Sequence, residues 1–202
     1  NENIIYLTFD DGPIPEVTPW VLDTLRSFDA KATFFCVGDN VRKHPEIYDM
    51  VIHAGHTVGN HTLNHLSGWA TENITYFHNI RHCARMVNSG LFRPPYGKLK
   101  PSQVQFLQRH YRIIMWDVLS GDFDRDIRPE DCAQNVIQHA EAGSIVVFHD
   151  SIKAEANLRH ALPMVLEHFT REGYTFPSLP KLAPAVAERG LRVAVEEIFI
   201  YF

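Results

Sequence analysis

The sequence predicts an α/β fold, a distorted (β/α)7-type barrel whose strands are parallel. Short apolar runs alternate with helical stretches about seven times along the 202 residues. This alternation is typical of βαβ units, and acids, histidines and an arginine follow five of the expected strands. No linker, internal repeat or low-complexity segment divides the chain. We therefore expect a single domain over residues 1–202, a length that can bury a full core.

The expected strands are short runs rich in apolar residues that end at polar or turn residues. They lie at residues 4–9, 31–37, 56–60, 91–93, 111–118, 144–148 and 174–179. The last segment, 180–202, is less regular, and residues 191–195 are a candidate for one more strand.

Helices are expected where apolar residues recur at helical spacing or where start and stop signals frame a segment. They lie at residues 17–29, 40–54, 71–89, 101–110, 129–142 and 154–172. Apolar residues from Val17 to Phe28 have this spacing, and Pro101 suits a first helical turn. Four helices are each followed by a glycine that can end a helix, namely Gly55, Gly90, Gly143 and Gly173.

Charge and composition argue against several classes of protein. The formal net charge is −5, whereas nucleic-acid binding needs a basic face. No apolar run reaches the roughly 18 residues of a membrane span, so we expect none. No signal-peptide pattern is visible, and because the chain begins with Asn1 we expect a trimmed N-terminus. The three cysteines lack metal-ligand spacing, and the sequence indicates neither a redox compartment nor an oligomeric state.

Two adjacent acids, Asp10 and Asp11, directly follow the first apolar run and precede Gly12-Pro13. Adjacent carboxylates repel, and burial of either costs several kcal/mol unless a cation or hydrogen bonds compensate. An acidic turn is the simple alternative, since Asp-Gly and Gly-Pro both favour turns. The residues that follow the other strands decide between these interpretations.

Two histidines, His61 and His65, follow the third expected strand. On a helical turn their i, i+4 spacing places both imidazoles on one face, where they can bind one metal ion together with a carboxylate. The alternative is a pair of surface or capping histidines. His78 and His82 share this spacing without a strand-end carboxylate nearby, and we expect them on a solvated helix face.

Arg93 ends the fourth expected strand and precedes Pro94-Pro95-Tyr96. An arginine at the mouth of a barrel can keep a carboxylate ionised and oriented. The two prolines can stiffen the loop and so fix the backbone N–H of Tyr96, as an oxyanion requires. A surface arginine on a tight turn is the alternative.

Further polar residues follow the fifth and sixth expected strands. His149 follows a nearly all-apolar strand, and by itself it is an ordinary core-edge histidine. The neighbouring Asp150-Ser151 would equally suit a helix cap. The group at the end of the fifth expected strand comprises Trp116, Asp117, Ser120, Asp122 and Asp124.

Three of these stretches resemble the motifs of the polysaccharide deacetylases, the NodB-homology domain of carbohydrate esterase family 4. They are Thr8-Phe9-Asp10-Asp11-Gly12, His61-Thr62-Leu63-Asn64-His65 and Arg93-Pro94-Pro95-Tyr96-Gly97. The motifs occur in the family's order and on the expected strands. The resemblance covers residue 4 to about residue 180, and three ordered motifs make it highly specific.

The resemblance implies a catalytic role for four residues. Asp10 would be the general base, and Arg93 would orient it. The Tyr96 backbone amide would stabilise the oxyanion, and His149 would be the general acid.

The resemblance also implies a metal site and a substrate pocket. A divalent ion would be held by Asp11, His61 and His65. Zn²⁺ is the first choice, with Co²⁺, Ni²⁺ or Mn²⁺ as alternatives. The pocket would be lined by Pro94, Pro95, Trp116, Phe123 and Val147. Phe123 stands where the family usually has a tryptophan, and together with Val147 it suggests a reshaped pocket.

One departure concerns the general acid. The family's Asp that orients the catalytic histidine is expected at the position of Leu119. A leucine can neither orient an imidazole nor raise its pKa. Either this role passes to Asp117, Asp122 or Asp150, or His149 is less well oriented and has a less suitable pKa for a general acid.

The residues and the resemblance together predict a hydrolase that acts on carbon–nitrogen bonds other than peptide bonds. It would remove N-acetyl groups from N-acetylglucosamine-containing glycans such as peptidoglycan or chitin-like oligomers, using a metal-activated water. The same site would also suit an O-acetyl esterase or a small-amide hydrolase, and a non-catalytic glycan- or metal-binding relative is the less favoured alternative. A glycan or oligosaccharide partner favours the cell envelope or another extracytoplasmic site.

Overall fold

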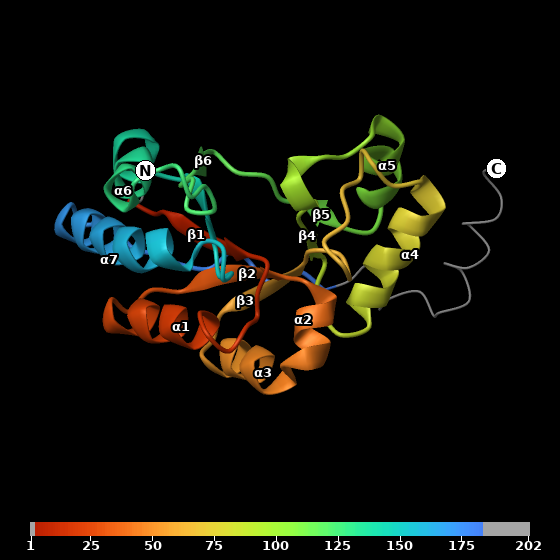
Figure 1. Cartoon of the computed structure of the whole chain (residues 1–202), viewed down its shortest axis with the longest axis horizontal. Helices are drawn as coiled ribbons and strands as arrows, with labels where there is room; N and C mark the ends of the chain where they lie inside the picture. Colours follow the sequence, from red (N-terminus) through yellow and green to blue (C-terminus); the bar gives the residue numbers. More distant parts are fainter. Residues whose placement is uncertain (1–2, 184–202) are drawn as a thin grey trace.

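The computed structural model describes residues 3–183, in which seven strands form one curled parallel sheet (Figure 1). The order across the sheet is β5-β4-β3-β2-β1-β7-β6, and every neighbouring pair is parallel. The strands are β1 (Tyr6–Asp10), β2 (Ala32–Cys36), β3 (Thr57–Asn60), β4 (Leu91–Phe92), β5 (Arg112–Ile113), β6 (Val118–Leu119) and β7 (Ile145–His149). The predicted fold class, an α/β barrel of distorted shape with parallel strands, is confirmed.

Helices follow most of the strands and flank the sheet. They are α1 (Thr18–Ser27), α2 (Gly38–Lys43), α3 (Pro45–His53), α4 (Asn73–Ala84), α5 (Pro101–Leu107), α6 (Pro129–His139) and α7 (Glu155–Arg171), with a short 3-10 helix, η1 (Pro95–Gly97). Figure 1 shows α1 and α3 together below the central strands, and α6 and α7 together beside β1. Within the described part of the chain, no helix combines the length and apolar character that a membrane crossing requires.

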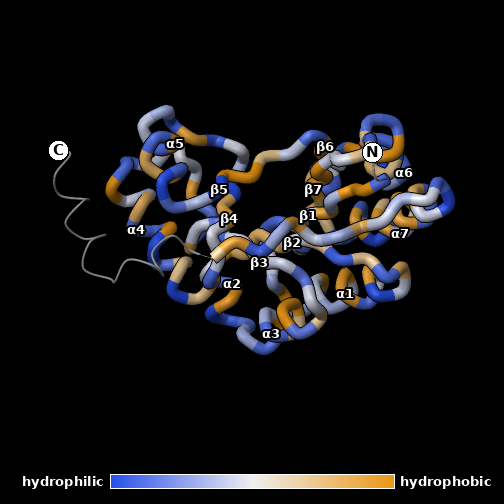
Figure 2. The backbone as a smooth tube through the Cα atoms, turned by 180° about the vertical axis from the view of Figure 1, so that it is seen from behind, coloured by the Kyte–Doolittle hydropathy of each residue, from blue (hydrophilic) through white to orange (hydrophobic). Residues whose placement is uncertain are grey.

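The main hydrophobic core lies between the outer face of the sheet and the helices. Phe9 of β1 stacks on Phe34 of β2 and Phe148 of β7, with ring centroids 5.1 and 6.0 Å apart. Val21 of α1 and Leu162 of α7 are fully buried in the same cluster. In Figure 2 β7 is hydrophobic along its length, whereas α7 alternates between hydrophobic and hydrophilic residues. This packing fixes the strands, and so it also fixes the positions of the residues at their ends.

The predicted helix over residues 40–54 is wrong as one element, because two helices occupy it. α2 ends at Lys43 and α3 begins at Pro45, with His44 between them at φ −133° and ψ 57°. A residue before proline is disfavoured in the helical region, because the proline ring clashes with its backbone. Pro45 therefore starts a new helix inside the span that was predicted as one helix.

The predicted fifth and seventh strands are also corrected. Residues 111–118 form β5 and β6, which lie at opposite edges of the sheet, and residues 114–117 cross between them. In place of a strand at 174–179, Thr175 forms an isolated parallel bridge with Ile4. The candidate strand at residues 191–195 lies outside the described residues.

Candidate active site

The polar residues expected at strand ends gather at the carboxyl-terminal ends of the strands. Asp10, the last residue of β1, is in register with His149, the last residue of β7. On the other side of β1, Asn60 of β3 is in register with Phe92 of β4, so His61 and Arg93 follow paired residues. Strands that are far apart in the sequence therefore deliver these side chains to one place.

Asp11, His61 and His65 form one group that can hold a metal ion, and their ligand atoms lie within 4.8 Å of one another. The two histidines do not lie on a helical turn, as the spacing suggested. They lie in a loop in which Thr62 and His65 have φ values of 65° and 55°. This loop is held from α4, because the Asn79 side chain accepts a hydrogen bond from the backbone N–H of Leu63 at 2.7 Å.

Hydrogen bonds on the far side of each imidazole fix its orientation. His61 Nδ1 is 2.8 Å from the carbonyl oxygen of Arg93, which can only accept, so Nδ1 carries the proton. His65 Nδ1 is 3.2 Å from the Tyr96 hydroxyl, which can accept in the same way. With Nδ1 protonated, each Nε2 atom presents a lone pair, and these two atoms lie 3.8 and 3.1 Å from Asp11 Oδ1.

The Asp11 carboxylate completes this set of acceptors. Its Oδ1 atom is buried and has no aligned hydrogen-bond donor among the described residues. Burial alone would raise the pKa of Asp11, but His65, His61 and His149 together lower it to about 2. Two imidazole lone pairs and a carboxylate oxygen facing one point fit a divalent cation, because a cation removes the repulsion between acceptors.

The backbone of Asp11 has an unusual conformation, with φ at 86°. The Asn40 side chain at the start of α2 donates to the Asp11 carbonyl oxygen at 2.8 Å. Left-handed backbone at an aspartate is uncommon and persists when surrounding contacts hold it. No pattern in the sequence indicated Asn40, because its contact depends on the packing of α2 against the end of β1.

Arg93 is fully buried and joins several elements on the inner side of the sheet. Its Nη1 atom donates to Asp10 Oδ1 at 2.8 Å and to Thr8 Oγ1 at 2.7 Å. Its Nε and Nη2 atoms donate to the carbonyl oxygens of Ile114 and Met115. Burial lowers the pKa of Arg93, and the Asp10 carboxylate opposes this effect. The buried pair leaves Oδ2 as the oxygen of Asp10 nearer the metal-ligand group, 4.0 Å from His61 Nε2.

Asp122 is the acid that holds His149. Its Oδ1 atom lies 2.7 Å from His149 Nδ1, and its Oδ2 atom accepts the backbone N–H of His149 at 2.7 Å. Burial lowers the pKa of the His149 imidazole, but Asp122, Asp10 and Asp11 outweigh this effect and raise the pKa to about 9. Of the three acids that could replace the aspartate missing at Leu119, only Asp122 has this contact. Leu119 therefore does not leave His149 without a carboxylate.

The residues expected to line a pocket lie around these pairs. Phe123 packs edge-on against His149, with ring centroids 5.2 Å apart. The Trp116 ring lies 5.7 Å from the Arg93 guanidinium carbon, and Val147 is buried beside Thr8 in the β1–β7 register.

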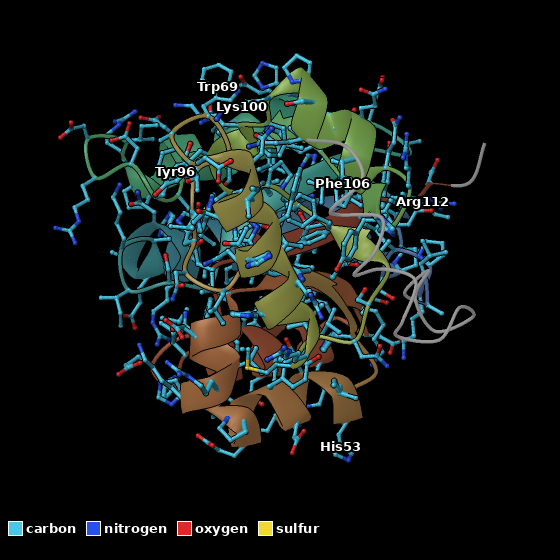
Figure 3. All side chains as sticks on the ribbon, turned by 90° about the vertical axis from the view of Figure 1, so that its right-hand side faces the viewer. His53, Trp69, Tyr96, Lys100, Phe106 and Arg112 are labelled. Carbon is cyan, nitrogen blue, oxygen red and sulfur yellow. The ribbon has the colours of Figure 1, made fainter. Side chains whose placement is uncertain are left out.

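The loop after β4 carries the remaining expected residues. Pro94 and Pro95 are buried, whereas the Tyr96 side chain is 61% exposed. In Figure 3 Tyr96 lies at the surface on the same side as Trp69 and Lys100, away from His53. The backbone N–H groups of Gly97 and Lys98 donate to the carbonyl oxygens of Pro94 and Pro95, which fixes the peptide at Tyr96.

Comparisons with known proteins show which family this chain belongs to. The family model for polysaccharide deacetylase matches residues 1–111. A peptidoglycan-N-acetylglucosamine deacetylase of Bacillus cereus is 32% identical over 189 residues, which cover 90% of this chain and 89% of that protein. A chitooligosaccharide deacetylase of Azorhizobium caulinodans is 34% identical over 158 residues, which cover 74% of this chain and 75% of that protein.

A solved structure shares the fold. It is a peptidoglycan N-acetylglucosamine deacetylase with a TM-score of 0.84 and 29% identity, and the match covers 89% of this chain and 87% of that chain. With the matched family model, the relatives and the shared fold, this chain belongs to the polysaccharide deacetylase family.

Proposed function

We propose that this chain hydrolyses the N-acetyl group of N-acetylglucosamine units in a glycan, with peptidoglycan or a chitin-like oligomer as the substrate class. The observation that carries this proposal is that three features lie together at the carboxyl-terminal ends of the strands. They are the acceptor set of Asp11, His61 and His65, the buried Asp10–Arg93 pair and the Asp122–His149 pair. The names of the relatives from Bacillus cereus and Azorhizobium caulinodans support the substrate class.

Asp11, His61 and His65 would hold one divalent cation. Two imidazoles and a carboxylate are a common ligand set of catalytic zinc, so Zn²⁺ is the first candidate, with Co²⁺, Ni²⁺ or Mn²⁺ as alternatives. When bound, such an ion supplies a Lewis acid that polarises the acetyl carbonyl and lowers the pKa of water. A proton on Nδ1, which the Arg93 carbonyl oxygen requires of His61 and the Tyr96 hydroxyl can accept from His65, would leave Nε2 available as the ligand atom.

Asp10 would be the general base. Its Oδ1 atom accepts from Arg93, which pairs with the carboxylate and fixes its plane. Its Oδ2 atom lies on the side of the ligand group and is the oxygen that takes a proton from the attacking water. General-base assistance of this kind is typically worth about 10²–10⁴-fold in rate.

His149 and Tyr96 would serve the later part of the reaction. Asp122 holds the proton on His149 Nδ1, so Nε2 is the atom that donates a proton to the leaving amine. The Asp122 carboxylate raises the pKa of this imidazole and so favours its protonated form. The fixed backbone N–H of Tyr96 would stabilise the oxyanion.

Acetate release from a short N-acetylglucosamine oligomer tests this function. We expect chelator-stripped protein to release acetate only after Zn²⁺ is added. No release with Zn²⁺ shown to bind would contradict the proposed substrate and point to an O-acetyl ester or a small amide. Release from neither these compounds nor the oligomer would indicate a non-catalytic relative. Because the relatives are named for peptidoglycan, we also propose that the chain acts outside the cytoplasm.

A further inference from the structure

Asp150 is a buried carboxylate for which the proposed reaction has no use. It directly follows His149 and is 1% exposed. Its side chain does not contact the imidazole, and it does not cap α7, whose N-cap is Ala154. Instead Oδ1 accepts the backbone N–H of Gly12 at 3.0 Å, and Oδ2 accepts the hydroxyl of Thr18 at 2.6 Å.

These bonds tie Asp150 to both sides of the loop that follows β1. The backbone N–H of Asp150 donates to the carbonyl oxygen of Asp10 at 3.1 Å. The Thr18 hydroxyl also accepts the backbone N–H of Ile14 at 2.9 Å. The loop is therefore held at Asp10 by the backbone of Asp150, at Gly12 by its carboxylate, and at Ile14 by the Thr18 hydroxyl that the carboxylate fixes.

The glycine in this loop is explained by the same carboxylate. A Cβ atom on Gly12 would lie 1.9 Å from Asp150 Oδ2, so any side chain there would displace the carboxylate. The preceding residue, Asp11, has its backbone at φ 86°. A left-handed backbone is unfavourable for an aspartate and needs contacts that hold it. Asn40 holds the carbonyl side of Asp11, and Asp150 holds the amide that follows it.

We propose that Asp150 is a positioning residue for the metal site. It fixes the Gly12 amide and the Thr18 hydroxyl, and so it keeps Asp11 in the backbone conformation that directs its carboxylate to His61 and His65. Asp150 touches neither the substrate nor the reacting atoms. The inference rests on the proposed function in one respect, namely that Asp11, His61 and His65 bind a metal ion.

Zn²⁺ affinity, measured by competition with a chromophoric chelator at a temperature where every variant is folded, tests the proposal. We expect Asp150→Ala to weaken Zn²⁺ binding about 10–100-fold, as loss of groups that orient metal ligands does. Asp150→Asn keeps an oxygen that can accept the Gly12 N–H, so its affinity should stay within about threefold of wild type. Thr18→Val loses one hydroxyl and should weaken binding by at least about threefold.

Asp117→Ala is the matched control. Asp117 Oδ2 accepts the backbone N–H of Ile145 at 2.9 Å, at the opposite end of β7 from His149. Its loss removes a similar bond without touching the loop after β1, so Zn²⁺ affinity should not change. A purely structural role for Asp150 would lower thermal stability and leave affinity unchanged.

The outcomes separate this inference from the proposed function. Equal Zn²⁺ affinity in wild type and folded Asp150→Ala would overturn the role of Asp150 alone. If Asp150→Ala does not fold, Thr18→Val decides in its place, and unchanged affinity there would overturn the role. Failure of the wild-type protein to bind Zn²⁺ would overturn both proposals.

Discussion

The three candidate metal ligands direct their ligand atoms toward the same point. For His61 one neighbour sets the orientation, because the Arg93 carbonyl oxygen accepts a hydrogen bond from Nδ1–H and leaves Nε2 free to bind a metal ion. The sequence indicated the residue types and their order, so all three candidate ligands could be named from it. It could not indicate their orientation, because the groups that set it are a backbone carbonyl and the Tyr96 phenol from another loop.

Asp122 illustrates the same limit at a single residue. From the sequence, Asp117, Asp122 or Asp150 could have held the imidazole of His149. Nothing in their spacing distinguished them. In the fold Asp117 binds the start of β7 and Asp150 binds the loop after β1, which leaves Asp122 for His149. The choice depends on where the chain passes after β6, and this is a tertiary property.

The Tyr96 phenol should contribute to metal affinity separately from the backbone N–H of the same residue. Tyr96→Phe keeps the backbone and removes the hydroxyl that lies 3.2 Å from His65 Nδ1. We expect Zn²⁺ affinity to fall about tenfold, because a ligating histidine loses its outer partner. Trp69→Phe, which changes another exposed aromatic residue, is the control in the same chelator competition. Equal affinities for Tyr96→Phe and wild type would contradict this role.

At the scale of elements, the alternation of strands and helices was predictable and the breaks within it were not. The break at Pro45 had a local signal, since a proline disfavours helix at the residue before it. The division of residues 111–118 between two sheet edges had none, because β5 and β6 pair with strands distant in sequence. The loop of His61 and His65 likewise depends on Asn79 of α4 for its shape.

The start of β2 depends on a neutral histidine before β3, and this predicts how stability changes with pH. His56 Nδ1 accepts the backbone N–H of Ala32 at 3.1 Å. Burial, with a smaller effect from Lys31, lowers the pKa of His56 from 6.5 to about 4. Between these pH values the unfolded chain binds a proton that the folded chain does not bind. The contribution of neutral His56 to the free energy of unfolding is therefore complete above pH 6.5 and is lost as the pH falls toward 4.

We expect His56→Asn to remove this pH dependence, because its amide oxygen can accept from Ala32 and does not titrate. Between pH 7 and pH 4 the wild-type protein should lose about 2–3 kcal/mol more unfolding free energy than the variant. Urea unfolding at several pH values measures this difference. The exposed His78→Asn serves as control and should follow the wild-type curve. Parallel curves for His56→Asn and wild type would show that His56 does not titrate as described.

At the scale of the whole molecule, Arg93 joins the site to the architecture. It extends from the end of β4 to β1 and to residues 114 and 115, which cross between the two edge strands. A fully buried guanidinium is tolerated because Asp10 neutralises it and carbonyl oxygens accept its other protons. The Arg93–Asp10 pair, which would orient the general base, therefore also packs on the inner side of the sheet.

A double-mutant cycle on Arg93 and Asp10 should show this coupling. Arg93→Leu leaves Asp10 buried without its partner, and we expect a loss of about 3–5 kcal/mol in unfolding free energy. Adding Asp10→Asn should recover part of this loss, because the remaining side chain is neutral. Urea unfolding of the wild type, both single variants and the double variant gives the coupling energy. Strictly additive losses would mean that the pair does not stabilise the fold as a unit.

The decisive measurement for the division between the base Asp10 and the metal ligands is the Zn²⁺ content and acetate release of Asp10→Asn. The asparagine keeps an oxygen for Arg93, and the ligand set of Asp11, His61 and His65 is unchanged. We expect this variant to retain one tightly bound Zn²⁺ per chain while acetate release from the N-acetylglucosamine oligomer falls about 10²–10⁴-fold. Turnover near the wild-type rate would contradict Asp10 as the base, and loss of Zn²⁺ would contradict the division between base and metal ligands.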